Sequence, residues 1–575
     1  MKRIISVFLS IIMVFSIAAV AFSTEAFAEE QPVQTKVINE EALIKAFSDT
    51  VSDLNLDSLK IPNSWDDLGN MLLKVVYSIA DKLIDIIVSM INNFVPSVQF
   101  DTVETYDDNM FFKGMDSFIT TPAEGAKWYL GYASASLQTG DELDGKHFVG
   151  GSLSFPDTKA ATEIYDDQRV RVIAVNDNSG RGTVVFAVLD AFGMSNTDVR
   201  GIRKELAEFA KEKNIIGINI SVLHQHSCVD TFGMNGDLLK MIFANPAINI
   251  CNKYLGTDFS VLNGQNKSFM ENVYNVTSNA IKQAVNSMQS GKLLYSEIDA
   301  TEYIRDKREP KVFDTNIHRF RFVPDEGGME TWICNMAIHC VGNGAAGTAI
   351  TGDYPYYMEK VINEAGANFI EIQGAELAIS SEYKPLNVSD ELTGIEKLGI
   401  YGETLGKLVV ESTNAETEVA PILNYTMDEY NVPVTNEILE FAGRMGALTN
   451  TVVKVENEDY DLVIPTEIGF AEFGNISVAI IPGELEPAIA YGGYLTADNS
   501  WKNEDFDYPC FKDIVGKDKT LLVFGLMNDQ IGYIIEDNDY SSILSGVNEE
   551  IVASGDLAGS ATINAFETLY NGIIR

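Results

Sequence analysis

The sequence predicts an α/β (mixed α+β) protein with large β-sheets flanked by helices, preceded by an extra helical segment. From about Gly114 onward, short β-rich runs alternate with helical segments over most of the chain. Hydrophobic residues make up 46% of the composition, which is enough for a sizeable core. Before that point, the apolar residues follow a helical period instead. We therefore expect residues 1–28 to be a signal peptide, 29–110 a helical segment and 111–575 the main domain.

Residues 1–28 have the features of an export signal. Lys2 and Arg3 give a positive start, 4–22 is an apolar run, and Ala26-Phe27-Ala28 is a small-x-small cleavage site. The alternative is an uncleaved membrane anchor, but the cleavage triplet favours removal. The mature protein is expected to be secreted or extracytoplasmic.

The clearest element of the 29–110 segment is Met71–Val95. Its polar residues recur at steps of three and four, and nearly everything else is apolar. The charges weigh against a transmembrane span. Two interpretations stay open: the apolar face packs on the main domain, or it makes a peripheral contact with lipid or a partner.

In the main domain, strands and helices follow one another in chain order. A bulky C-terminal β-sandwich is not evident, and the last predicted element is a helix-like run, Ser560–Tyr570. Strands are predicted at 170–175, 184–190, 215–223, 332–339, 476–481 and 520–526, and helices at 198–213, 356–366, 404–415 and 435–445.

The charge balance excludes one class of partner. Acidic residues outnumber basic ones by 83 to 41, whereas nucleic-acid binding needs clustered Lys and Arg. The same excess disfavours simple electrostatic docking to an anionic membrane. The five cysteines form no CxxC pair, so no disulfide framework is predicted, and the oligomeric state is left open.

Two histidines stand together at the end of a predicted strand, in His224-Gln225-His226. Residues at i and i+2 of an extended segment share a face, and neutral imidazole is the commonest metal ligand. His339 ends another predicted strand. Each of these histidines is also compatible with an ordinary hydrogen-bonded role.

Two further residues occupy equivalent positions. Glu484 follows the strand 476–481 after a Pro-Gly turn, and Tyr533 follows the strand 520–526. His224, His339, Glu484 and Tyr533 thus all lie just after the carboxyl end of a predicted strand, where α/β folds place their sites. Two His, one Glu and an open position match catalytic zinc ligation.

The ordered series of motifs resembles the catalytic domain of the neutral/alkaline, non-lysosomal ceramidases. The likeness extends over about residues 130–570. Its strongest parts match the family's His-Thr-His-Ser, Ile-His-Pro, Pro-Gly-Glu and Asn-Asp…Gly-Tyr motifs. In chain order, the similar segments are 131–133 with 138–140, 169–171, 184–190, 223–227, 337–340, 352–355, 482–484, and 525–529 with 532–533.

The resemblance implies a Zn²⁺ held by His224, His339, Glu484 and Tyr533. It also implies hydrolysis of an N-acyl lipid amide through a zinc-activated water. His226 would position substrate or water and donate a proton to the leaving nitrogen. Arg305, the nearest counterpart of an arginine near the family's reaction centre, would stabilise the developing oxyanion together with Tyr533.

The chain also departs from the family pattern. The segment 373–380 lies where the family has a Gly-Asp-x-Ser-Pro-Asn motif, and one register puts Ala378 where the family has its active-site serine. Cys228 stands where the family has a glycine after its His-Thr-His-Ser motif. The alternatives are therefore a zinc hydrolase of the same fold acting on another N-acyl amide or an ester, and a non-catalytic binding protein on this scaffold.

Overall fold

The computed structural model describes most of the chain from Val95 onward, together with five helical residues before it. These are Lys74, Tyr77, Asp81, Ile84 and Val88; the continuous ranges are 95–107, 110–150, 160–235, 238–342, 347–389, 391–457, 459–542 and 549–575. The predicted export signal 1–28 and most of the 29–110 segment lie outside them. Among the described residues, no helix combines the length and apolar character needed to cross a membrane.

A nine-stranded mixed sheet forms the larger half of the molecule. Strands β4–β5 and β9–β11 pair in parallel, and the other neighbours pair antiparallel. The spatial order is β11 (Ala367–Gln373), β9 (Glu330–Met336), β8 (Asn316–Pro324), β6 (Gln289–Asp299), β1 (Trp128–Ser136), β3 (Arg169–Asn176), β4 (Thr183–Leu189) and β5 (Ile215–Val222), with β13 (Thr417–Glu418) beside β6.

A five-stranded sheet forms the other half. Its order is β14 (Leu423–Pro433), β16 (Leu462–Phe473), β17 (Ile476–Ile480) and β19 (Thr520–Phe524), with β15 (Val453–Lys454) beside β16. Only β17 and β19 pair in parallel. Their shared direction brings the ends of both strands to one edge, which matters for the site described below.

The two sheets pack face to face, and aromatic side chains fill the space between them. Phe186 of β4 lies 5.6 Å from Phe524 of β19, and Phe320 of β8 lies 5.7 Å from Phe473 of β16, measured between ring centroids. All four side chains are buried. Large apolar side chains of this kind contribute about 1.5–3 kcal/mol each when fully buried.

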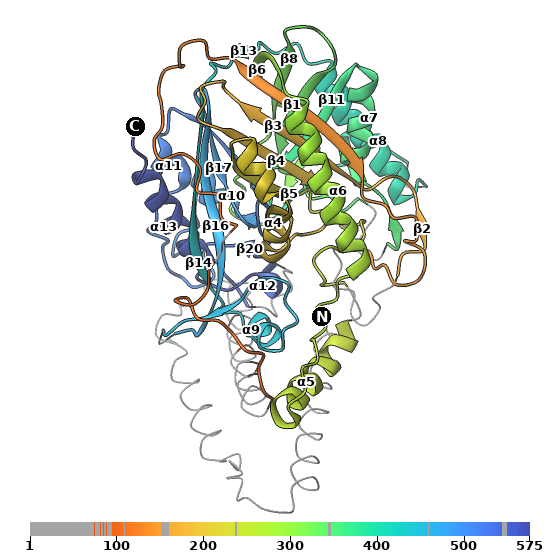
Figure 1. The fold of residues 1–575 in the computed structure, drawn as a ribbon, viewed down its shortest axis with the longest axis vertical. Helices are drawn as coiled ribbons and strands as arrows, with labels where there is room; N and C mark the ends of the chain where they lie inside the picture. The colour runs from red at the N-terminus through yellow and green to blue at the C-terminus, as the bar shows by residue number, and fades with distance from the viewer. Residues whose placement is uncertain are drawn as a thin grey trace, which may run out of the picture.

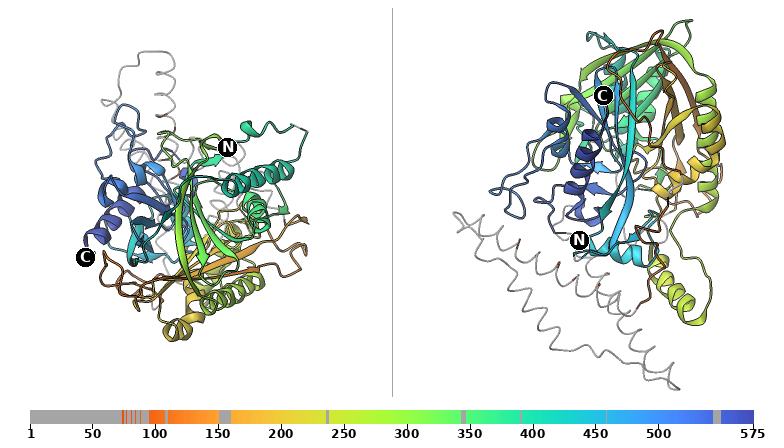
Figure 2. Two further views of the ribbon diagram at one scale, coloured as in Figure 1. Left: turned by 90° about the horizontal axis from the view of Figure 1, so that it is seen from above. Right: turned by 60° about the vertical axis from the view of Figure 1, so that its left-hand side comes forward.

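Helices cover the outer face of each sheet (Figures 1 and 2). The helices α4 (Asn196–Glu212) and α6 (Lys267–Asn286) pack on the large sheet, and α13 (Ala558–Asn571) and α11 (Phe511–Val515) pack on the small one. The pair α7 (Asp353–Glu364) and α8 (Gly394–Val410) lies beside β11. This arrangement confirms the predicted class of large mixed sheets flanked by helices.

One helix begins earlier than the sequence pattern predicts. We expected it over 404–415, but α8 begins at Gly394 and ends at Val410. Thr393 and Glu396 form a capping box, in which each side chain accepts from the backbone of the other. This cap satisfies backbone donors that would otherwise be left without partners, so the helix begins there.

The described residues of the N-terminal segment contact the main domain. Lys74 Nζ donates to the carbonyl oxygens of Ser500 and Trp501 at 3.2 and 3.0 Å. Ser542 Oγ donates to Asp81 Oδ1 at 2.7 Å. After Val95 the chain is extended rather than helical, and residues 102–103 run beside β15.

Candidate metal centre

The ends of the two sheets are joined by hydrogen bonds between loops. After β19, Asn528 exchanges hydrogen bonds with Ile220 of β5: its backbone N–H donates at 2.7 Å and its side-chain oxygen accepts at 3.0 Å. The Gly525 N–H donates to Gln373 O at the end of β11, at 2.9 Å. Residues that follow β5, β9, β11, β17 and β19 are therefore gathered at one edge of both sheets.

His224 leaves the line of its strand through a left-handed backbone. β5 ends at Val222, and His224 has φ 53°. Its Nδ1 lies 2.9 Å from Phe192 O, while the buried Nε2 makes no hydrogen bond. Burial, followed by the neighbouring His226 and His339, lowers the pKa of His224 well below its usual value. The ring is therefore neutral and suited to ligate a metal through Nε2.

His226 lies beside His224 and is the more exposed of the two. The ring centroids are 4.7 Å apart, and that of His226 lies 6.0 Å from His339. The backbone N–H of His226 donates to Cys340 O at 3.0 Å. The expectation that both rings face one space agrees with this geometry, although a left-handed turn rather than a continued strand produces it.

His339 and Glu484 meet at the centre of the cluster. His339 Nε2 lies 3.0 Å from Glu484 Oε2, and its Nδ1 lies 3.1 Å from Ile379 O. Burial opposes a positive charge on His339, but the carboxylates of Glu376 and Glu484 outweigh it and raise its pKa to about 9. The strand β9 ends at Met336, so His339 lies three residues beyond it, in an isolated β-bridge with Ser380, rather than in the strand predicted to include it.

Glu484 also reaches the other histidine. Its Oε2 lies 3.2 Å from His224 Nε2, and its Oε1 accepts from Gln530 Nε2 at 2.9 Å. Burial raises the pKa of Glu484, and its hydrogen bonds with His339, Gln530 and Tyr533 oppose that shift. The Pro482-Gly483 turn redirects the chain after β17 and thereby brings Glu484 beside the two histidines.

Tyr533 is held opposite Glu484 by strand pairing. The short strands β18 (Glu484–Leu485) and β20 (Tyr533–Ile534) run parallel and pair Glu484 with Tyr533. The Tyr533 ring stacks on His339 at 6.4 Å between centroids, and its hydroxyl hydrogen-bonds to Glu484. Burial, followed by nearby carboxylates, raises the pKa of Tyr533 well above 10.

The donor atoms fit a divalent metal such as zinc. Zinc bonds of about 2.0–2.2 Å separate neighbouring ligand atoms in a tetrahedron by about 3.3–3.6 Å. Glu484 Oε2 lies 3.0 Å from His339 Nε2 and 3.2 Å from His224 Nε2, and both separations are close to that spacing. Both histidines use Nδ1 toward a backbone carbonyl oxygen, an outer-shell contact that fixes the tautomer of metal-ligating histidines.

The structure also places Arg305 and Ala378, which the family resemblance singles out. Arg305 lies on β7 (Ile304–Asp306), next to Ser380 of β12 (Ile379–Ser381), and its side chain is exposed. In the described residues no contact joins it to His224, His339 or Glu484, so its catalytic role stays a prediction. Ala378 is buried beside Tyr533 and presents no hydroxyl to the site.

Sequence reasoning missed Glu376 as a member of the cluster. Glu376 is fully buried in the turn between β11 and β12, and its Oε2 lies 3.6 Å from His339 Nδ1. Burial, followed by the nearby Glu484, raises its pKa to about 8, while His339 opposes the shift. The available signal was the one used for Glu484, since Glu376 also follows the end of a buried strand.

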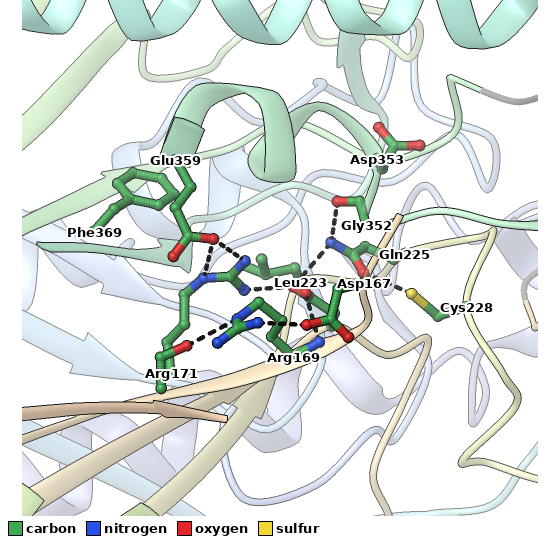
Figure 3. A network of polar contacts seen from close by, with 12 residues as sticks. Asp167, Arg169, Arg171, Leu223, Gln225, Cys228, Gly352, Asp353, Glu359 and Phe369 are labelled. Carbon is green, nitrogen blue, oxygen red and sulfur yellow. Dashed lines mark hydrogen bonds and ion pairs between the residues drawn. The ribbon is translucent and has the colours of Figure 1, made fainter. Parts of the chain in front are cut away.

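A buried polar network holds Gln225, the residue between the two histidines (Figure 3). Gln225 Nε2 donates to Asp190 Oδ1 at 3.1 Å and to Gly352 O at 2.6 Å, and the Cys228 thiol donates to Gln225 Oε1 at 2.8 Å. Asp190 in turn accepts from Arg171 at 2.7 Å. The residue between the two histidines is thereby fixed to the core of the large sheet.

No protein-family model and no curated protein sequence matches the chain. Solved structures of ceramidases are among those similar in fold. A neutral ceramidase from Pseudomonas aeruginosa aligns with a TM-score of 0.54 and 13% identity, over 78% of this chain and 75% of that chain. A ceramidase complexed with C2 aligns with a TM-score of 0.54 and 12% identity, over 77% and 75%. The chain therefore has a ceramidase-like fold.

Proposed function

We propose that this protein, built on a ceramidase-like fold, is an exported zinc-dependent hydrolase that cleaves the amide bond of ceramide or a related N-acyl lipid. The observation that carries the proposal is the convergence of His224 Nε2 and His339 Nε2 on Glu484 Oε2, at 3.2 and 3.0 Å. Two imidazoles and one carboxylate, with a tyrosine beside them, form a donor set suited to catalytic zinc.

Zinc bound there would polarise the amide carbonyl and supply an activated water. His224, His339 and Glu484 are all buried, so competing bulk water is excluded from the ligand atoms. The partly exposed His226 would donate a proton to the leaving nitrogen. The Tyr533 hydroxyl would donate a hydrogen bond to the carbonyl oxygen as negative charge develops on it.

One observation favours a second candidate substrate. The turn between β11 and β12 presents the Glu376 carboxylate, and Ala378 has no hydroxyl. A hydroxyl group of the substrate would meet the Glu376 carboxylate here, instead of the serine hydroxyl that the ceramidase motif places at this position. Another N-acyl amide, or an ester, is therefore the alternative to ceramide.

Turnover on a panel of ceramides, other N-acyl amides and matched esters tests this proposal. Wild-type protein with zinc should release free acid and amine from at least one N-acyl substrate. A chelator should abolish release, and added zinc should restore it. Protein that binds zinc but turns over no substrate would contradict the proposal and favour the binding-protein alternative.

A further inference from the structure

The Glu376 side chain has an unusual environment for a carboxylate. It is fully buried, and neither of its oxygen atoms has a hydrogen-bond partner within the described part of the chain. Burying a carboxylate without partners costs several kcal/mol, so a compensating positive charge is expected nearby. The ion pair that Glu376 makes is with His339, whose Nδ1 lies 3.6 Å from Glu376 Oε2. No lysine or arginine among those same residues pairs with it.

The turn that carries Glu376 is fixed from both sides. Gly374 N–H donates to Met336 O at 2.8 Å, and Leu377 N–H donates to Leu485 O at 3.3 Å. Within the turn, Ile379 N–H donates to Glu376 O at 2.8 Å. The backbone of Glu376 is thus held between the strand end leading to His339 and the strand that bears Glu484.

One carboxylate oxygen of Glu376 lies near donor atoms of the candidate metal centre. One oxygen of Glu376, one nitrogen of His224 and one oxygen of Glu484 all lie within 4.8 Å of one another. Two buried carboxylates this close repel each other unless one is protonated or a cation lies between them. A divalent cation would neutralise both charges and provide the direct partner that the oxygen atoms of Glu376 lack.

We propose that Glu376 is a further ligand of the metal held by His224, His339, Glu484 and Tyr533. The inference rests on the proposed function, because it assumes that this centre binds a divalent cation. The donor set then contains two carboxylates and two imidazoles. The two carboxylate charges balance a divalent cation within the buried site.

Zinc affinity measures this role without reference to turnover. Metal-free wild type, Glu376→Gln and Glu371→Gln are titrated with Zn²⁺ in competition with a chromophoric chelator. Glu371 is a matched control: it lies on β11, is equally buried, and already accepts a hydrogen bond from Tyr354 at 2.6 Å. Loss of a ligand should weaken zinc binding in Glu376→Gln by more than the about 10–100-fold that is typical of an outer-shell partner, whereas Glu371→Gln should bind as wild type does.

Each outcome decides the inference. Equal affinity of wild type and Glu376→Gln would overturn it, even if turnover fell, because Glu376 would then act on the substrate. If Glu376→Gln does not fold, Glu376→Asp keeps the charge but shortens the side chain, and it should also bind zinc more weakly. Wild type that binds no zinc would overturn both the inference and the proposed function. Wild type that binds zinc tightly and turns over substrate, together with Glu376 variants of the same zinc affinity, would overturn the inference alone.

Discussion

Gln225 stands between the two adjacent histidines, and its side chain enters the core instead of the site. Three contacts hold it, with Asp190, Gly352 and Cys228 (Figure 3). A buried amide with both ends engaged fixes the backbone on either side of it. Gln225 is therefore a positioning residue for His224 and His226.

Gln225→Ala should weaken both the fold and the metal centre. Removing the side chain leaves Asp190 with one donor fewer, which should cost about 1–3 kcal/mol in free energy of unfolding. Supporting residues of this kind typically change metal affinity by about 10–100-fold. Urea unfolding and a zinc competition titration measure the two effects.

Gln168→Ala is the matched control for that experiment. Gln168 is also buried, and it contacts the backbone of Val229 rather than the histidine segment. We expect this variant to lose stability but to keep the zinc affinity of wild type. An equal loss of zinc affinity in both variants would show that general loosening, not positioning, is responsible.

At the residue scale, sequence reasoning could identify His224, His339, Glu484 and Tyr533 as candidates because each follows a predicted strand. It could not place their side chains. His224 has a left-handed backbone with φ 53°, and the two sheets are joined by hydrogen bonds between Asn528 and Ile220, neither of which the local pattern encodes. Arg305 shares a strand pair with Ser380, yet its side chain is exposed. Glu376 follows a buried strand, as Glu484 does, but it lacks the preceding Pro-Gly turn and was missed.

At the scale of elements, strand β3 carries two arginines with different surroundings. Arg171 is buried and donates to Asp190 Oδ1 at 2.7 Å and to Glu359 Oε2 on α7 at 3.0 Å. Arg169 keeps 29% of its side chain exposed and pairs with Asp167. Arg171 thereby joins the large sheet to α7, whereas Arg169 contributes to the surface.

Replacing each arginine by alanine should have unequal effects on stability. Arg171→Ala leaves Asp190 and Glu359 without their cation, and breaking a buried pair in this way costs about 3–5 kcal/mol. Arg169→Ala removes an exposed pair worth at most about 1 kcal/mol. Denaturant unfolding of the two variants measures the difference, and equal losses would contradict the role assigned to Arg171.

Element positions were the most predictable level of the fold. Long apolar runs such as 184–190 and 215–223 marked β4 and β5 to within one residue. The helix α8 was misplaced at its start because its cap, Thr393, lies eleven residues before the predicted beginning. The pairing order of the two sheets depends on contacts between distant segments, which local periodicity does not encode.

At the scale of the whole molecule, several carboxyl groups are buried with raised pKa values, in a chain of net charge −42. Burial raises the pKa of Glu371 to about 8, of Asp353 to about 7 and of Asp529 to about 7. A group whose pKa is higher in the folded state binds more protons there than in the unfolded chain. Stability then falls as pH rises through the interval between the two values.

The protein should therefore be more stable in mild acid than in mild alkali. For Glu371 the stabilisation is complete below its unfolded pKa, near 4.5, and is lost as pH rises toward about 8. Urea midpoints measured from pH 5 to pH 9 should decline, and Glu371→Gln should reduce the slope. A midpoint that rises steadily over this range would contradict the prediction.

Metal content is the most direct measure of the central claim that His224, His339, Glu484 and Tyr533 form one metal centre. Elemental mass spectrometry on purified wild type, His224→Ala and the buried control His318→Ala separates a site effect from a general one. His318 is held by Asp314 and Tyr295, away from the centre. The account predicts about one zinc per chain in wild type and in His318→Ala, lost in His224→Ala. Wild type without zinc, or His224→Ala with full occupancy, would contradict it.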